Sequence, residues 1–249
     1  TKSQNLPIGL RAMDAGDVDG DGQQEIVLAG ANRIHIFRRD LHRLIPVGGA
    51  STLTRYVIHS VSLADVNKNG RAEIYVSAAD AKGPRSLALE WDGQKFAPLF
   101  EDAEWYIRTV HLPGEGEVLA GQQAGLNDFL SPGLFRLGIA GHSLVKESAI
   151  DLPDKLNLFD FTLVDVDADG TPEIVMINQD DHLVVMSRSG QRLWVSDDYY
   201  GGTTRYLGGI DLAEPGALEE SLQTGEKRYY LPARIAARDI DRDGKIDII

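Results

Sequence analysis

Short apolar runs recur along the chain and are separated by turns rich in glycine and acidic residues. Residues 33–38 alternate between polar and apolar side chains, which is typical of a strand with one buried face. The runs that follow Glu25, Glu73 and Glu173 are continuous and rich in Ile and Val, which suits strands better than helices. We therefore predict an all-β protein built from short strands.

The expected strands fall into units of four, and each unit is about 50 residues long. The first unit comprises 10–16, 25–29, 33–38 and 44–47, and the second comprises 56–65, 73–77, 86–91 and 96–100. The third comprises 106–112, 117–122, 133–137 and 145–150, and the fourth comprises 159–165, 173–177, 182–186 and 192–195. Repeated four-stranded units of this length are typical of the blades of a β-propeller.

We expect one propeller domain over residues 1–249, with blades at about 8–50, 55–103, 104–152 and 157–198. An insertion follows at 199–226, with a short helix expected over 215–222 between a proline and a glycine. A fifth, incomplete blade over 227–249 starts with a strand expected at 228–239 and stops after two strands. Because a blade cut there would expose an apolar edge, we expect the chain to be a fragment of a larger propeller. The alternative is that residues 1–7 add an outer strand to the last blade.

A nine-residue pattern precedes the second strand in four of these units. Oxygen-bearing side chains occupy positions 1, 3, 5 and 9, and glycine occupies position 6, where it permits a sharp turn. Such oxygens converge on one point, which suits a hard cation with six to eight oxygen ligands, and the carbonyl of position 7 can add a backbone ligand. The candidate ligands are Asp17, Asp19, Asp21, Gln23 and Glu25; Asp65, Asn67, Asn69, Arg71 and Glu73; Asp165, Asp167, Asp169, Thr171 and Glu173; and Asp239, Asp241, Asp243, Lys245 and Asp247.

Calcium is the cation that these loops suit best. No Cys or His accompanies them, so zinc and copper fit poorly, and magnesium comes second because it demands a strict octahedron. An EF-hand would need Glu at position 12, where Leu28, Val76 and Met176 stand instead. We expect up to four structural Ca²⁺ ions, with the weakest site at the Asp65 loop, which has only two acids. The alternative is that the loops are simple turns, since Asp, Asn and Gly favour turns.

The third unit keeps the strands and the glycine turn over residues 106–121 but has lost the loop carboxylates, so we expect no metal there. Fourteen of the 38 acidic residues lie in the four loops, which accounts for most of the net charge of −13. No run of basic residues appears, so we expect no nucleic-acid partner. No apolar run approaches the 18 residues that suggest a membrane span. The chain has no cysteine, which excludes a disulfide scaffold and a thiol nucleophile.

No catalytic motif stands out in the sequence, and we predict no catalytic residue and no organic cofactor. The six histidines are scattered, and His35 and His59 are expected to be packed or surface residues of strands. Residues 197–206 combine tyrosines, adjacent acids and glycines, and could either bind a glycan or peptide or shield a blade edge. Trp91, Trp105 and Tyr106 are expected to pack within the blades.

The loop Asp-x-Asp-x-Asp-Gly-x-x-Asp/Glu before a strand, repeated at about 50 residues, resembles the FG-GAP/VCBS repeats of integrin α-type propellers. The Phe-Gly of that family is absent, and its Gly-Ala-Pro is reduced to Ala29-Gly30-Ala31. The chain is therefore more similar to the bacterial VCBS-type branch. The resemblance implies calcium between the first two strands of a blade and an extracytoplasmic location, secreted, periplasmic or at the cell surface.

Two classes of function remain open at this point. The first is a calcium-stabilised, non-catalytic interaction or adhesion module whose partner is a protein or a glycan. The alternative is a polysaccharide-acting enzyme, or a lectin-like glycan-binding propeller, that uses rim loops and residues 197–206. A calcium sensor fits less well, because a stacked propeller offers no obvious element with two states.

Overall fold

The computed structural model describes residues 6–41, 43–52, 54–125, 129–203, 205–208, 228–232 and 234–249. Within these ranges every regular element is a β-strand, which confirms the all-β prediction. The described ranges contain no helix long and apolar enough to cross a membrane. The helix expected over 215–222 lies outside the described residues.

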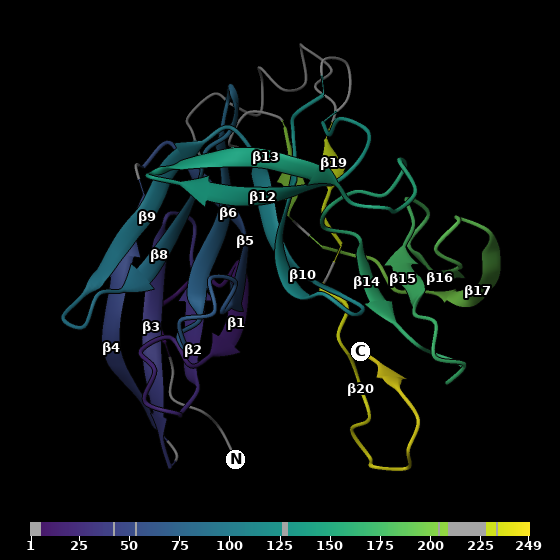
Figure 1. Cartoon of the computed structure of the whole chain (residues 1–249), viewed down its shortest axis with the longest axis horizontal. Coiled ribbons are helices and arrows are strands. Elements are labelled where there is room, and N and C mark those ends of the chain that lie inside the picture. Colours follow the sequence, from purple (N-terminus) through teal and green to yellow (C-terminus); the bar gives the residue numbers. More distant parts are fainter. Residues whose placement is uncertain are drawn as a thin grey trace.

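Four antiparallel sheets, each with at least four strands, follow one another along the chain (Figure 1). The first sheet contains β1 (Ala12–Gly16), β2 (Glu25–Ala29), β3 (Arg33–Asp40) and β4 (Arg43–Ser51). The second contains β5 (Val57–Ala64), β6 (Glu73–Asp80), β8 (Ser86–Trp91) and β9 (Phe96–Ala103), with β7 (Gly83–Pro84) paired to β6. The third contains β10 (Tyr106–Leu112), β11 (Gly116–Gln122), β12 (Phe135–Ala140) and β13 (Ser143–Ala149). The fourth contains β14 (Phe161–Val164), β15 (Glu173–Ile177), β16 (His182–Met186) and β17 (Arg192–Tyr199).

These four sheets have the up-and-down strand order of propeller blades, as the four-strand periodicity of the sequence predicted. The first strands of successive sheets lie against one another, β1 against β5, β5 against β10 and β10 against β14. The fourth strands lie at the outer edges, and many side chains of β4, β13 and β17 are exposed. Each blade therefore runs outward from a shared row of first strands.

The last part of the chain departs from the predicted strand pattern. The expected strand over 228–239 is divided, because β19 (Tyr229–Tyr230) pairs with β18 (Tyr206–Leu207) while β20 (Ala237–Arg238) pairs with β21 (Asp247–Ile248). Pro232 lies between the two short strands, and proline has no amide hydrogen with which to continue a ladder. The yellow β20 hairpin in Figure 1 is therefore a separate two-stranded unit that holds the fourth loop.

The continuous apolar runs are explained by strands that are buried on both faces. In β6, Ile74 and Val76 pack against the first blade, whereas Tyr75 packs against the third. In β15, Ile174 belongs to the core shared with the third blade, and Val175 belongs to a cluster that includes Ile235 near the fifth unit. Alternate side chains of one strand thus join two neighbouring blades, so a blade needs both neighbours to bury its apolar surface.

A buried histidine lies at the inner side of the second blade. The side chain of His59 in β5 is 5% exposed, and its Nδ1 is buried without a hydrogen-bond partner. Its backbone carbonyl accepts a hydrogen bond from Arg205 at 2.9 Å. Burial, together with the positive charges of Arg11 and Arg205, lowers the pKa of His59 to about 3. His59 is therefore neutral in the folded protein at any pH near neutrality, and it is a packed residue of its strand.

A second buried polar group lies between the third and fourth blades. Asp160 accepts hydrogen bonds from Asn157 at 3.0 Å and from the hydroxyl of Tyr229, and burial raises its pKa to about 6. Arg108 donates to the carbonyl of Phe161 at 2.8 Å and stacks over the ring of that residue. Burial lowers the pKa of Arg108 to about 10, so its guanidinium is still charged at neutral pH. These bonds fix β10, β14 and β19 to one another.

His59 provides a test of this buried interior by pH. Its folded pKa lies below the unfolded value of about 6.5, so its contribution to stability is complete above pH 6.5 and is lost as the pH falls toward 3. Between pH 7 and pH 5, we expect the free energy of unfolding of the unsubstituted protein to fall by about 2 kcal/mol more than that of the His59→Gln protein.

Urea unfolding in a chelator at the two pH values measures this difference without a contribution from bound cations. Asp160 titrates with the opposite sign as the pH falls from about 6 toward 4, but it is present in both proteins and cancels in the comparison. An equal pH dependence in the two proteins would show that the pKa of His59 is the same in the folded and unfolded states, so that it is not lowered by folding.

Candidate metal centres

The four predicted loops occupy the same place in their units. They connect β1 to β2, β5 to β6, β14 to β15 and β20 to β21. In each case the acid of position 9 is the first residue of the second strand, so it is fixed by the strand ladder while the other loop residues precede it. The loops are therefore equivalent in topology as well as in sequence.

The hydrogen bonds within the loops are also the same in all four. The amide of position 5 donates to Oδ1 of position 1 at 2.9–3.1 Å, and the amide of position 6 donates to its Oδ2 at 2.8–3.0 Å. The amide of position 2 donates to the carboxylate of position 9 at 2.8–3.3 Å. The amide of position 7, in Gln23, Arg71, Thr171 and Lys245, donates to the side chain of position 5 at 2.7–3.0 Å. The acid of position 1 thus organises the turn, and the acid of position 9 closes it.

Two residues of each loop adopt left-handed backbone conformations. The glycine of position 6 has φ between 85° and 90° in all four loops, as the sequence predicted. Position 4 also has positive φ, between 59° and 79°, although it is occupied by Gly20, Lys68, Ala168 and Arg242. No residue pattern indicates this second left-handed residue, because three of the four side chains are not those that favour the conformation.

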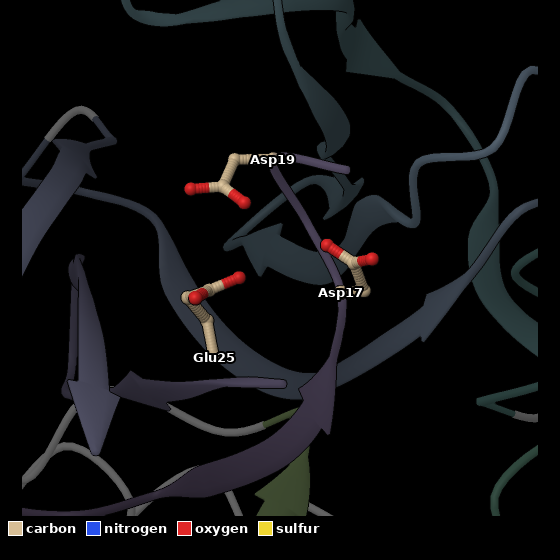
Figure 2. Close-up of side chains that lie close together, drawn as sticks. All are labelled: Asp17, Asp19 and Glu25. Atoms are coloured by element: carbon tan, nitrogen blue, oxygen red, sulfur yellow. The ribbon is translucent and has the colours of Figure 1, made fainter. Parts of the chain in front are cut away.

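The acids of positions 1, 3 and 9 come together in three loops. In the first loop, oxygens of Asp17, Asp19 and Glu25 all lie within 4.8 Å of one another, and Figure 2 shows the three carboxylates turned toward a common space. Ligand oxygens lie about 2.3–2.6 Å from Ca²⁺, so oxygens around one ion are at most about 5 Å apart. The spacing therefore fits one calcium ion. The equivalent groups are Asp165, Asp167 and Glu173 in the third loop, and Asp239, Asp241 and Asp247 in the fourth.

The remaining predicted ligands are placed differently. The acids of position 5, Asp21, Asp169 and Asp243, are not part of these groups of three. The second loop forms no such group among its described acids, because Asn67 and Asn69 hold positions 3 and 5.

The acid of position 9 is the most deeply buried of the candidate ligands. Glu25 and Glu73 are fully buried, and Glu173 is 6% exposed. Burial raises the pKa of both Glu25 and Glu73, because a charged carboxylate is disfavoured away from water. In Glu73, Oε2 accepts hydrogen bonds from the amide of Val66 and the hydroxyl of Tyr75, but Oε1 is buried without a partner. A buried carboxylate oxygen without a hydrogen-bond donor is the kind of ligand atom that a hard cation such as Ca²⁺ binds.

Two residues near the loops were missed by the sequence reasoning. Arg38 in β3 contacts three acids of the first loop, at 2.5 Å to Asp19, 3.0 Å to Asp21 and 3.1 Å to Glu25. Glu90 in β8 accepts hydrogen bonds from the side-chain amides of the second loop. Both lie on the third strand of their blade, opposite position 9. Only the strand register could have identified them, because they follow position 9 at different distances in the sequence.

The third blade has no comparable loop. β10 and β11 are joined by the three residues 113–115, and His111 forms a hydrogen bond with Glu117 at 3.1 Å across the start of the turn. The aromatic residues expected to pack do so: Trp91 contacts Phe96, Trp105 contacts Phe135 and Tyr106 contacts Phe159. Prediction of a packing role was therefore correct for all three.

The segment 197–206 is divided between elements. Its first three residues complete β17, and Tyr206 belongs to β18, while Thr204 lies outside the described residues. Tyr199 is 76% exposed and its ring lies 4.6 Å from that of His182, and Tyr200 is 51% exposed. The segment thus presents aromatic side chains at the surface next to the outer strand of the fourth blade.

Similarity to a known sequence family is found in one region of the chain, residues 17–76. A comparison with curated protein sequences found no significant match. Among solved structures, the chain is similar to a lectin from Agrocybe aegerita described as recognising non-reducing terminal N-acetylglucosamine, with 17% sequence identity and a TM-score of 0.37. The match covers 74% of this chain and 51% of the lectin, so the chain spans about half of the length of that protein.

The sequence pattern of the FG-GAP-like repeat matches residues 17–76, from the first residue of the first loop to the strand that follows the second loop. This range contains two complete loops and the strands β2 to β5 between them. The resemblance inferred from the loop motif is thereby confirmed, and residues 17–76 of this β-propeller chain match the FG-GAP-like repeat.

Proposed function

We propose that the protein is a calcium-stabilised, non-catalytic interaction module of an extracytoplasmic protein. Its Ca²⁺ ions are structural and lie in the loops at 17–25, 65–73, 165–173 and 239–247. The observation that carries this proposal is the identical hydrogen-bond pattern of the four loops, in which the acids of positions 1 and 9 hold the same main-chain amides.

The proposed ions would act by neutralising charge at the turns between first and second strands. Three carboxylates within 4.8 Å of one another repel, and a divalent cation between them replaces this repulsion by attraction. The loops also touch each other, since the amide of Ala72 in the second loop donates to the carbonyl of Asp17 in the first at 2.7 Å. An ion that fixes one loop would therefore help to fix the angle between neighbouring blades.

The proposed location and partners follow from the same chemistry. Calcium near millimolar concentration outside the cytoplasm would fill even weak oxygen-ligand sites, whereas cytosolic levels would not. The FG-GAP-like repeat supports a role in binding, with a protein or a glycan as the partner. Rigid blades joined by ions would hold exposed outer strands and loops in fixed positions for such a partner.

Substitution of one loop acid tests the structural role of the ions. We expect Asp167→Ala to lower the melting temperature in millimolar calcium and to have little effect in a chelator. At a calcium concentration of 100 times Kd, loss of one site removes about 2.7 kcal/mol of stabilisation. Thermal unfolding with and without calcium, together with metal content by mass spectrometry, measures both quantities.

Asp180→Ala is the matched control, because it removes the same charge from the same blade outside the loop. The control should show the same calcium-dependent stabilisation as the unsubstituted protein. If the unsubstituted protein binds no calcium and melts at the same temperature in chelator, the loops are only turns and the proposal is wrong.

A second candidate function is glycan binding at the outer edge of the fourth blade. The observation that favours it is the exposure of three aromatic side chains there, Trp194, Tyr199 and Tyr200, which are each at least 51% exposed. Exposed aromatic rings offer flat apolar faces with a polar tip, a combination suited to sugar rings.

If this surface binds a glycan, we expect Trp194→Ala and Tyr199→Ala each to lower retention on the bound glycan at least about tenfold, the loss expected for one buried aromatic contact. A glycan array with the purified protein identifies the sugar and then measures the variants. Leu193→Ala is the control, since Leu193 is equally exposed on the same strand but is not aromatic. Equal binding by all variants would place any glycan site elsewhere.

A further inference from the structure

The residue on the third strand that lies opposite position 9 differs in charge between the first and second blades. In the first blade, Glu25 pairs directly with Arg38 in the register of β2 and β3. In the second, Ile74 pairs with Leu89 at the end of the ladder between β6 and β8, and Glu73 and Glu90 are the residues next to this pair on the side of the loop. The two blades thus direct opposite charges at the same place beside their loops.

In the first loop, the arginine already contacts the atoms that a cation would need. Arg38 Nη2 lies 2.5 Å from Asp19 Oδ2 and 3.0 Å from Asp21 Oδ2, and its Nε lies 3.1 Å from Glu25 Oε1. Asp19 and Glu25 are two of the three acids that converge with Asp17. An arginine guanidinium is positively charged at any physiological pH. A Ca²⁺ ion that binds at this loop would have to displace the guanidinium of Arg38, a positive charge that is covalently attached to the blade.

In the second loop, the third strand adds a negative charge. Glu90 Oε1 lies 2.9 Å from Asn67 Nδ2 and 2.5 Å from Asn69 Nδ2, so its carboxylate faces positions 3 and 5 of the loop. The oxygen and nitrogen of an asparagine amide exchange places on a half-turn of the side chain, which would turn both amide oxygens toward the same space.

The second loop also lacks an internal counter-charge. Among the described residues, Asp65, Glu73 and Glu90 form no ion pair, and the nearby Arg71 instead donates to the carbonyl of Trp91 at 2.9 Å. The fully buried Glu73 keeps one oxygen, Oε1, without any partner. The carboxylates of Asp65, Glu73 and Glu90 do not converge as closely as the acids of the first loop. With the two amides they nevertheless surround the loop with oxygen-bearing side chains, and the unpartnered Oε1 of Glu73 favours a cation more strongly than the two acids of the loop sequence suggest.

We propose that the third strand sets the cation affinity of the neighbouring loop: Arg38 acts as a built-in cation that competes with Ca²⁺ in the first loop, and Glu90 is an additional Ca²⁺ ligand of the second loop. The first loop, and not the Asp65 loop, is then the weakest of the sites. This inference rests on the proposed calcium binding by the loops. The third loop serves as a reference site with no charged residue at the corresponding place of the third strand. Ser187 follows β16 there, and its hydroxyl group forms a hydrogen bond with that of Ser189 and not with the loop.

Tyr75 allows the second loop to be observed separately. Its hydroxyl lies 3.0 Å from Glu73 Oε2, so a terbium(III) ion bound in this loop in place of Ca²⁺ would be excited through tyrosine. Loss of the emission in Tyr75→Phe assigns the signal to this site. Titration of terbium then gives the affinity of the second loop, and competition by Ca²⁺ gives its calcium affinity.

For the second loop, we expect Glu90→Gln to weaken the Tyr75-dependent terbium site about tenfold, since ligand charge tunes the affinity of such loops. Glu101→Gln is the control, because it removes the same charge from an exposed position on β9. An unchanged affinity in Glu90→Gln would overturn the role of Glu90.

For the first loop, the measurement is the number and affinity of Ca²⁺ ions by isothermal titration calorimetry. We expect Arg38→Gln to raise the affinity of one site about tenfold, whereas Arg39→Gln, on the opposite face of β3, leaves all sites unchanged. Arg38→Lys keeps the positive charge and should also leave the site weak, which separates charge from loss of packing. Identical titrations of Arg38→Gln and Arg39→Gln would overturn the role of Arg38.

The outcomes separate this inference from the function on which it rests. If no loop binds Ca²⁺ or terbium, the proposed calcium function itself fails. If ions bind and Asp167→Ala removes one of them, but Arg38→Gln and Glu90→Gln behave as their controls do, only the role of the third strand is wrong.

Discussion

The convergence of like charges at the strand turns is the constraint on which the rest of the molecule depends. Acids of positions 1, 3 and 9 lie within 4.8 Å of one another in three loops, and in the loops at 17–25 and 165–173 they lie next to the start of a buried strand. Such groups are stable only if their charge is balanced, and the acid of position 9 cannot turn toward water because its strand is fixed in the sheet. Hydrogen bonds from main-chain amides supply part of this balance, and a cation would supply the remainder.

The same acids link local turn geometry to the packing of blades. Position 9 begins the second strand, and that strand has apolar side chains on both faces, so it contributes to the cores on either side. A loop that fixes the start of this strand therefore fixes the register of the sheet and the orientation of two cores. The proposed cation binding at the turns would for this reason be coupled to the burial of Ile74, Val76 and Tyr75.

The third strand shows how one fold can adapt each repeat separately. Arg38 and Glu90 occupy equivalent places, yet one places a positive charge and the other a negative charge beside the loop. A change of one residue at this position alters the charge of the site without changing the loop motif. Loops that share a sequence pattern can consequently differ in their need for a cation, and the pattern alone does not rank them.

The sequence by itself determined the all-β class, the four-strand units and the position of every loop, because strand periodicity and turn chemistry are local properties. It also identified Glu25, Glu73 and Glu173 as the acids that close the loops. Tertiary structure decided which residues join them: Arg38 and Glu90 are distant in sequence and reach the loops only through strand register. It also decided that the expected strand over 228–239 is divided, since β19 pairs with β18 across a long stretch of chain. Such long-range pairings depend on which strands meet in space, and no local pattern specifies that.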